Sequence, residues 1–530
     1  MNAPNVEIPD RMNAATAFID DNVEAGRGDR IAIHYTPDDS TLTYAEVLAA
    51  VNRAGNALRD IGIDLEQRVL LLLLDGPDFV SCFFGAIKIG VVPIPTNTLL
   101  EPDDYEYLLN DSRARALIVS EPLLKRIEPI RNRLLYLRHL IVASGPDGAE
   151  PELPASSGAQ SVYSLGEITA SAAPELDPEP MSKDDPCFWL YSSGTTGFPK
   201  GTVHLQHDML YCADTYGRHV IAIRDTDVTF SVAKLFFAYG LGNALYFPFR
   251  VGASTVLFPG RPEPAAVFEI IERTTPTILY SVPTSYGAML AHEGAPGRKA
   301  LASVRICVSA GEALPPALYD RWLERYGVEI LDGIGSTELL HMFIANRPGA
   351  VRPGSSGQIV PGYEARIVDE HGHDAPVGQI GDLLIKGDST CALYWNRHRQ
   401  TKETILGEWI RTGDKYRADE DGYYWYQGRT DDMLKVGGIW VSPFEVEAAL
   451  LEHPRVLEVA VVGAEDADHL TKPKAFVVLR HGTQPDEHLA TTLKLFVKNT
   501  IAPFKYPRWI EFVESLPKTA TGKIQRYKLR

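Results

Sequence analysis

The sequence is short of paired cysteines and of long apolar runs. Its 530 residues include five cysteines, and no two of them lie close together in the chain. That spacing excludes a disulfide framework and a zinc-binding pattern, and it predicts reduced thiols. The strongest apolar run, 69–74, is far too short to span a membrane, and residues 1–10 lack the basic and apolar regions of a signal peptide. We therefore expect a cytoplasmic protein that does not insert into membranes.

Positive charge is also scarce. Lys and Arg number 52 against 69 Asp and Glu, which gives a net charge of −17. This balance argues against nucleic-acid binding and against electrostatic docking on anionic lipid. Apolar residues make up 45% and charged residues 23%, which are ordinary values for a globular chain and exclude dominant disorder. The length allows about three to five structural units and excludes a single small binding module.

Helical and strand-like segments alternate along the chain. Residues 44–61 have apolar side chains at helical spacing, 69–74 read as a buried strand, and 78–89 read as another helix. The alternation predicts an α/β fold whose large N-terminal domain has mixed or parallel sheets flanked by helices. The stretch 145–185 is rich in Pro, Gly and Ser and predicts a surface linker feeding a strand, whereas 363–428 predicts a β-rich subdomain.

After residue 429 the pattern of helices and strands restarts. Residues 443–451 and 489–499 have helical character, and 456–462 and 474–479 read as strands. We therefore expect a small α+β C-terminal domain of about 100 residues. The predicted division is a 1–430 domain and a 432–530 domain joined by a hinge.

A loop rich in Ser, Thr and Gly follows a predicted strand at 187–191. Glycines let a backbone approach phosphate oxygens, hydroxyls and amides donate hydrogen bonds, and a lysine neutralises charge. The loop is not a Walker A sequence, which needs adjacent Gly-Lys followed by Ser or Thr. A flexible Gly/Ser linker or hairpin is the plainer alternative. The candidate phosphate-binding residues are Ser192, Ser193, Gly194, Thr195, Thr196, Gly197 and Lys200.

Further motifs follow this loop in a fixed order and extend almost to the last residue. Together they resemble the signature motifs of the adenylate-forming enzymes, which comprise acyl-CoA synthetases, non-ribosomal peptide adenylation domains and luciferases. The resemblance runs from about residue 30 to 530 and implies ATP, Mg²⁺ and, for an acyl-CoA synthetase, coenzyme A. The segments that carry it are 191–201, 309–315, 332–338, 411–414, 428–438 and 516–524.

The resemblance assigns nucleotide-binding roles to individual residues. It implies that Asp332 contacts the adenine amino group and that Thr337 binds the α-phosphate. It also implies that Glu338 holds Mg²⁺, which suits a hard cation, and that Asp414 accepts the ribose hydroxyls. Taken alone, residues 335–338 would read as a capped helix start and Asp414 as part of an ordinary turn. The other implied nucleotide-binding residues are Gly311, Glu312, Gly333, Ile334 and Arg429.

The C-terminal motifs imply a second set of roles. Lys523 corresponds to the lysine that catalyses adenylation, and Asp431 to the hinge between the domains. Lys435 and the glycines 437–438 correspond to the face that serves thioester formation. The plainer alternatives are a charged linker and a solvated basic tail. The sequence departs from the family pattern at Trp440, where tyrosine is expected beside the thiol tunnel.

Residues 233–243 lie where the family builds its acyl pocket. Aromatic side chains with small residues between them suit a flat ring. The alternatives are a buried core segment and, for His341, a satisfied core histidine. The candidate acyl-binding residues are Ala233, Phe236, Tyr239, Gly240, Gly333 and His341.

Segments outside the shared motifs resemble the benzoate–CoA ligases more specifically. They include 75–79, 95–100, 466–475 and 495–524. The resemblance implies ATP-dependent ligation of benzoate to coenzyme A through an acyl-AMP. A hydroxy- or aminobenzoate ligase and a stand-alone enzyme that loads a carrier protein are the alternatives, with a luciferase and a non-catalytic ATP sensor as weaker ones. The expected partners are small molecules, and the frequency of two-fold assemblies favours a homodimer.

Overall fold

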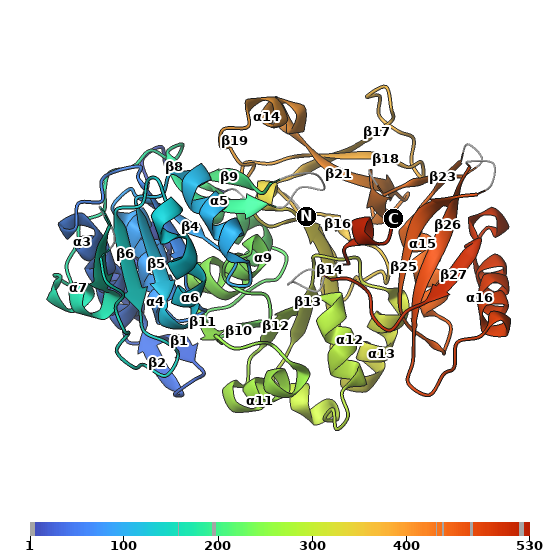
Figure 1. The fold of residues 1–530 in the computed structure, drawn as a ribbon, viewed down its shortest axis with the longest axis horizontal. Helices are drawn as coiled ribbons and strands as arrows, with labels where there is room; N and C mark the ends of the chain where they lie inside the picture. The colour runs from blue at the N-terminus through green and yellow to red at the C-terminus, as the bar shows by residue number, and fades with distance from the viewer. Residues whose placement is uncertain are drawn as a thin grey trace.

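The computed structural model describes residues 6–156, 158, 160–192, 198–430, 432–436, 439–466, 470–518 and 524–530. The C-terminal elements, in red, form one end of the molecule, and the earlier elements form the rest (Figure 1). All five cysteines are free thiols with buried side chains, as expected from their spacing. Within the described ranges, no helix is both long enough and apolar enough to cross a membrane.

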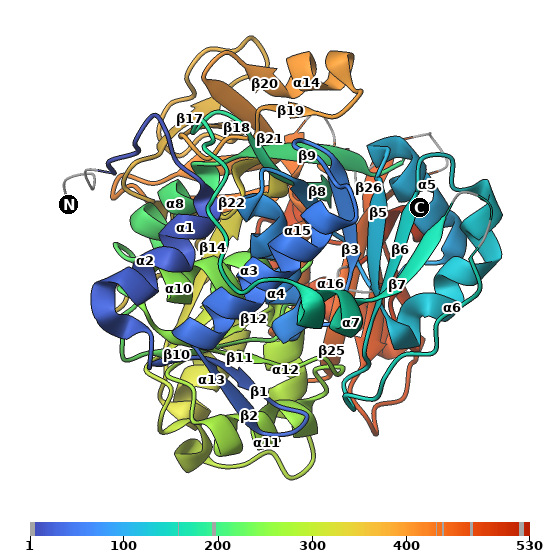
Figure 2. The same cartoon turned by 90° about the vertical axis from the view of Figure 1, so that its left-hand side faces the viewer.

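A five-stranded, wholly parallel sheet forms the first layer, in the order β4-β3-β5-β6-β7. Its strands are apolar because both faces are covered. Helices α3, α4 and α7 cover one face, and α5 and α6 cover the other (Figures 1 and 2). Helix α3 begins where the Thr43 hydroxyl and the Glu46 carboxylate cap each other's backbone amides. The bounds are β3 Arg68–Leu72, β4 Val92–Pro95, β5 Ala116–Ser120, β6 His139–Ala143, β7 Ser161–Ser164, α3 Tyr44–Asp60, α4 Pro77–Lys88, α5 Pro102–Ser112, α6 Leu124–Ile127 and α7 Leu165–Ser171.

The expectation of a linker over 145–185 is wrong for its middle part. Strand β7 pairs in parallel with β6 and completes the sheet, and α7 follows it directly. The Ser164 hydroxyl accepts a hydrogen bond from the Glu167 amide and so starts α7. A short strand whose side chains are half exposed leaves little apolar periodicity in the sequence, which is why composition suggested a loop.

A nine-stranded sheet forms the second layer, in the order β16-β15-β14-β13-β12-β10-β11-β1-β2. The six strands from β14 to β1 are parallel, and the strands at both edges are antiparallel. The carboxyl ends of its parallel strands therefore meet along one edge, where α/β proteins commonly bind ligands. The bounds are β1 Ile31–Tyr35, β2 Ser40–Thr43, β10 Val228–Ser231, β11 Ser254–Leu257, β12 Ile278–Ser281, β13 Ile306–Ser309, β14 Ile330–Gly335, β15 Met342–Ala345, β16 Gln358–Ile359, α11 Pro264–Thr274, α12 Pro283–Ala291 and α13 Pro316–Tyr326.

Two antiparallel sheets complete the part before residue 430. One consists of β8, β9 and β19, and the other of β17, β18, β20, β21 and β22. The second confirms the β-rich character expected for 363–428. The bounds are β8 Pro186–Ser192, β9 Lys200–Leu205, β19 Leu393–Tyr394, β17 Glu364–Val368, β18 Gly381–Lys386, β20 Ile405–Leu406, β21 Trp409–Ala418 and β22 Tyr424–Arg429, with α14 His398–Thr404 beside them.

The C-terminal elements form an α+β unit with a hydrophobic core of its own. Strands β25 and β26 are antiparallel, and β27 joins β26 in parallel. Helix α15 covers the interval that the sequence predicted. The division at residues 430 and 432 stays a prediction. The bounds are β23 Leu434–Val436, β24 Ile439–Val441, α15 Pro443–Leu451, β25 Val456–Glu465, β26 Thr471–Leu479, α16 Glu487–Thr500 and β27 Trp509–Phe512.

Candidate active site

The predicted phosphate loop joins two antiparallel strands, so it sits in a hairpin and not between a strand and a helix. Ser192 at the end of β8 is in register with Lys200 at the start of β9. Residues 193–197, which hold the candidates Ser193, Gly194, Thr195, Thr196 and Gly197, lie outside the described residues. The Lys200 ammonium lies 4.1 Å from the ring centroid of Tyr394. The hairpin therefore places a cation at the start of β9, and its role in binding phosphate stays a prediction.

The Glu338 carboxylate is fixed by two hydroxyl groups from distant parts of the chain. Glu338 lies in the short helix η7 (Thr337–Leu339), and its Oε1 accepts hydrogen bonds from Ser192 Oγ at 3.3 Å and Tyr394 OH at 2.8 Å. The Ser192 hydroxyl also accepts one from Thr202 Oγ1 at 3.4 Å. Sequence reasoning missed Tyr394, because it lies in no recognised motif and is 56 residues from Glu338. Burial and the neighbouring Glu338 charge raise the pKa of the Tyr394 phenol, which keeps it a hydrogen-bond donor.

The Asp332 carboxyl lies in the middle of β14, where the pairing with β13 ends, and the residue is 5% exposed. It accepts a hydrogen bond from the Leu314 amide at 3.4 Å, but burial raises its pKa to about 8. A buried carboxyl of this kind gains from a donor such as an amino group. The next residue, Gly333, has no room for a side chain, since a Cβ there would lie 2.7 Å from Met342 Sδ and 2.8 Å from the Ile344 carbonyl oxygen. The carboxyl and the bare backbone together suit the edge and face of a purine.

The segment before β14 adds the two candidates Gly311 and Glu312. Gly311 adopts φ +90, a conformation that favours glycine. The Glu312 carboxylate accepts a hydrogen bond from Thr284 Oγ1 at 2.9 Å, which ties this turn to helix α12. Ile334, the remaining candidate of β14, packs against the main hydrophobic core.

Asp414 and Arg429 are brought together by strand pairing. They are direct partners on β21 and β22, and Arg429 Nη1 lies 3.1 Å from Asp414 Oδ1. Arg429 Nη1 also donates to the Thr412 carbonyl at 3.1 Å. The Asp414 carboxylate therefore lies in a fixed orientation with a guanidinium beside it, and its role as acceptor of the ribose hydroxyls stays a prediction.

His341 lies at the centre of an aromatic cluster. Its ring contacts Tyr216, Tyr239 and Phe247, with centroids 5.3, 5.6 and 4.5 Å away. Its Nε2 lies 3.1 Å from Asn243 Oδ1 and 3.3 Å from the Tyr239 carbonyl oxygen. Burial lowers the pKa of His341 to about 3, so the imidazole is neutral at pH 7. Tyr216 and Phe247 were not singled out from the sequence, because neither lies in the motif segments.

Of the other acyl candidates, Ala233 and Phe236 lie between β10 and α9 (Ala238–Leu241), Tyr239 and Gly240 lie in α9, and Gly333 lies in β14. Tyr239 donates from its hydroxyl to the carbonyl oxygens of Ser281, at 3.1 Å, and Val308, at 3.2 Å, at the ends of β12 and β13. At Gly240 a Cβ would lie 2.0 Å from the Lys234 carbonyl oxygen, so only glycine fits. The Ala233 carbonyl accepts from Ser231 Oγ, and the Phe236 ring lies tilted against Phe237 with centroids 4.4 Å apart.

The candidates for the second half-reaction are only partly described. Lys435 and Trp440 are direct partners on β23 and β24, so the backbone brings them together. Four of the predicted residues lie outside the described ones: Asp431, Gly437, Gly438 and Lys523.

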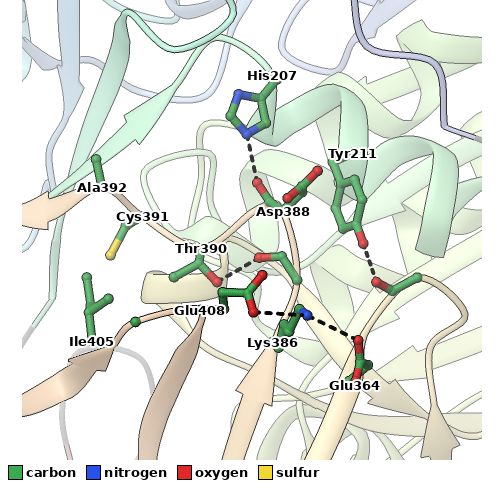
Figure 3. Close-up of a pocket in the computed structure, with 13 residues that line it drawn as sticks. His207, Tyr211, Glu364, Lys386, Asp388, Thr390, Cys391, Ala392, Ile405 and Glu408 are labelled. Carbon is green, nitrogen blue, oxygen red and sulfur yellow. Dashed lines mark hydrogen bonds and ion pairs between the residues drawn. The ribbon is translucent and has the colours of Figure 1, made fainter.

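A cavity of about 550 Å³ lies apart from these candidates, between the start of α8 (Asp208–Cys212) and the β17–β18–β20 sheet (Figure 3). Lys386 Nζ lies 3.5 Å from Glu364 and 3.3 Å from Glu408 across it. The His207 Nε2 donates to the Asp388 carbonyl at 2.9 Å. Its polar groups thus largely satisfy one another, and none of the residues predicted for nucleotide or acyl binding lines it.

Comparison with known proteins places this site in a family. Residues 20–395 match the AMP-binding enzyme model, and residues 445–523 match the AMP-binding enzyme C-terminal domain. The chain is 52% identical over 529 residues to the benzoate–CoA ligase of Thauera aromatica, covering 99% of this chain and 97% of that one. It is 46% identical to the 4-hydroxybenzoate–CoA/benzoate–CoA ligase of Rhodopseudomonas palustris, covering 98% and 94%.

Solved structures agree with the sequence matches. The benzoate CoA ligase from Burkholderia xenovorans LB400 superposes with a TM-score of 0.89 at 45% identity, covering 98% of this chain and all of that one. The anthranilate CoA ligase AuaEII in complex with anthranoyl-AMP gives a TM-score of 0.92 at 44% identity, covering 99% and 97%. The resemblance noted in the sequence is thereby confirmed, and the chain belongs to the AMP-binding, adenylate-forming enzyme family.

Proposed function

We propose that this protein is an ATP-dependent aryl-CoA ligase whose preferred acid is benzoate. The observation that carries the proposal is the 52% identity, over almost the whole of both chains, to a benzoate–CoA ligase. The neutral His341 within a shell of aromatic rings supports it, because such a pocket suits a flat apolar ring.

In the first half-reaction a benzoate oxygen attacks the α-phosphorus of ATP. The bond between the α-phosphorus and the bridging oxygen breaks, pyrophosphate leaves with that oxygen, and benzoyl-AMP forms. Lys200 neutralises phosphate charge and Lys523 stabilises the charge that develops at the α-phosphorus. Asp332 accepts the adenine amino group, and Asp414 accepts the ribose hydroxyls.

Mg²⁺ fits the donors that the structure provides. The Glu338 carboxylate is held in one orientation by two hydroxyl groups. One of them belongs to Tyr394, whose ring also contacts the Lys200 ammonium. A carboxylate oxygen together with phosphate oxygens is the donor set that Mg²⁺ prefers. When bound, the ion supplies charge neutralisation on the phosphates, and Glu338 is the residue that would hold it.

In the second half-reaction the thiol of coenzyme A loses its proton and attacks the carbonyl carbon of benzoyl-AMP. The carbon–oxygen bond to AMP breaks, and benzoyl-CoA and AMP leave. We propose that the two half-reactions use two arrangements of the domains 1–430 and 432–530, which rotate relative to each other about Asp431. Rotation withdraws Lys523 and brings the Lys435–Trp440 hairpin and the glycines 437–438 to the thiol.

The partners are thus ATP, coenzyme A and an aromatic acid, all of them small cytoplasmic metabolites. We assign the enzyme to the cytoplasm, where both cosubstrates are available. We also propose that it forms a homodimer, because two-fold assemblies are the most frequent. Sedimentation at several protein concentrations tests the assembly, since a dimer has twice the 58.5 kDa mass of the monomer.

The experiment that tests the function is AMP release from ATP, Mg²⁺ and coenzyme A with a panel of acids. The panel contains benzoate, hydroxybenzoates, aminobenzoates, cyclohexane carboxylate, a medium-chain fatty acid and acetate. We expect the highest kcat/KM for benzoate and formation of benzoyl-CoA with free coenzyme A. A preference for acetate or the fatty acid contradicts the aromatic pocket, and adenylation without thioester formation favours an enzyme that loads a carrier protein.

A substituted benzoate is the second candidate substrate. It is favoured by the relatives, which include a 4-hydroxybenzoate–CoA/benzoate–CoA ligase and an anthranilate CoA ligase. The Tyr216 and Tyr280 hydroxyls near the aromatic cluster also have no hydrogen-bond partner among the described residues, so they are available to a ring substituent. A misfit the size of one ring substituent costs about 1–3 kcal/mol of transition-state binding. The kcat/KM values from the same panel therefore rank benzoate against the substituted benzoates.

A further inference from the structure

Three consecutive carbonyl groups of η7 each accept a hydrogen bond from β9 or from residues 389–391. The Thr337 carbonyl oxygen lies 2.8 Å from His204 Nε2. The next two carbonyl oxygens accept hydrogen bonds from the Cys391 amide at 2.8 Å and from Ser389 Oγ at 2.9 Å. Of these three donors, only the imidazole can lose its donor hydrogen by changing tautomer. The Thr337 carbonyl also accepts the neighbouring Leu340 amide at 3.2 Å, so His204 adds a contact to it from a distant part of the chain.

The opposite side of the His204 ring is fixed by Asp208. His204 Nδ1 lies 2.7 Å from Asp208 Oδ2, and both side chains are 0% exposed. The same carboxylate oxygen accepts a hydrogen bond from the Leu205 amide at 3.1 Å. Phe188 stacks on the imidazole with centroids 5.2 Å apart and sets the plane of the ring. The ring is therefore locked in position, in a place where water does not reach it.

The acceptors determine where the hydrogens lie. The Thr337 carbonyl can only accept, so Nε2 carries a hydrogen. Asp208 Oδ2 accepts the Leu205 amide and lies against Nδ1, so it holds the ring with Nε2 directed at the Thr337 carbonyl. The ring is thus held on both sides, by the Asp208 carboxylate at Nδ1 and by the Thr337 carbonyl at Nε2.

We propose that His204 is a positioning residue for adenylation and that Asp208 holds it in the donating form. The inference rests on the proposed function, in which Thr337 and Glu338 bind the α-phosphate and its metal ion. The hydrogen bond to the Thr337 carbonyl sets the peptide plane between those two residues, and so sets where both side chains point. Misplacement of reacting groups by a fraction of an ångström is costly to rate.

Three variants test the proposal: His204→Ala, His204→Gln and Asp208→Asn. Removal of the donor in His204→Ala should lower kcat/KM for MgATP in pyrophosphate release at least tenfold, with KM for benzoate unchanged. The amide of glutamine can place an N–H near the position of Nε2, so His204→Gln should recover to within about threefold of wild type. In Asp208→Asn the amide oxygen must face Leu205, so the neutral ring cannot satisfy both contacts, and we expect a loss close to that of His204→Ala.

Asn22→Ala is the matched control. Asn22 is 1% exposed and donates to the Phe18 and Phe249 carbonyls at 2.7 and 2.8 Å, so it is also a buried side chain that anchors backbone carbonyls. It should lower Tm without changing kcat/KM for MgATP. The proposal is overturned if His204→Ala behaves like this control, or if His204→Gln is as slow as His204→Ala. A wild-type protein that releases no pyrophosphate with any acid in the panel would instead refute the proposed function.

Discussion

The Asp332 carboxyl should make the ligand-free protein less stable as pH rises. Burial raises the pKa of this group from 3.8 to about 8, so the folded protein binds a proton that the unfolded chain has already lost. Stability falls with pH wherever the folded state binds more protons than the unfolded state. The loss begins near pH 4, grows through pH 7 and levels off above about pH 8.

The size of the effect follows from the pKa shift. One pKa unit corresponds to about 1.4 kcal/mol, so the full shift amounts to at most about 6 kcal/mol. Asp332→Asn removes the titrating group, keeps the shape and can still accept from the Leu314 amide. The variant should therefore gain Tm relative to wild type at pH 8.5 and much less at pH 5.5. The same variant should bind ATP more weakly, since the carboxylate for the adenine amino group is gone.

The assay is thermal unfolding of the ligand-free protein at several pH values between 5.5 and 8.5, followed by tryptophan fluorescence. Asp227→Asn is the matched control, because Asp227 is also buried but its pKa is shifted in the opposite direction. Burial acts to raise this pKa, but hydrogen bonds from Arg305 and the Arg224 amide lower it below the ordinary value. That variant should lose Tm by an amount that stays constant over the same pH range, since the stabilisation is complete above the unfolded pKa. A Tm difference between Asp332→Asn and wild type that does not change with pH would refute the reasoning.

Two further substitutions test the site. Tyr394→Phe removes a hydrogen bond of 2.8 Å to the Glu338 carboxylate. Because a hydrogen bond to a charged group contributes about 1.5–3 kcal/mol, kcat/KM for MgATP should fall at least tenfold, with KM for benzoate unchanged. A fall of less than about twofold would contradict this expectation. Gly240→Ala places a Cβ 2.0 Å from the Lys234 carbonyl oxygen, so it should raise KM for benzoate and lower Tm, whereas the same change at Gly372, where a Cβ meets nothing within 4 Å, should leave KM for benzoate unchanged.

Much of the fold could be predicted because its elements are long and strongly periodic. Helix α3 and helix α15 were placed within a residue or two, since their apolar spacing and capping residues are local in sequence. The short β7–α7 pair was missed because β7 has four residues, of which only Ser164 is buried, and these leave no clear period. The family and the order of its motifs were also visible, because each motif is a contiguous string of residues.

The contacts that join the motifs could not be predicted in the same way. Tyr394 reaches Glu338 across 56 residues, and His204 reaches Thr337 across 133. Such pairs depend on which strands become neighbours, and strand pairing between distant segments leaves no local pattern in a single sequence. The sequence thus indicated the ligand-binding candidates, whereas the groups that hold them in place became visible only in the structure.

Strand β9 carries the chemistry of the site on one side and its packing on the other. Lys200, Thr202 and His204 alternate along one face, about 7 Å apart, and contact Tyr394, Ser192 and the Thr337 carbonyl respectively. Gly201 and Val203 point the other way, against Trp189 and Trp395. Substitutions at the even-numbered Lys200, Thr202 and His204 should therefore change the kinetics. Substitutions at the odd-numbered Gly201 and Val203 should instead change Tm.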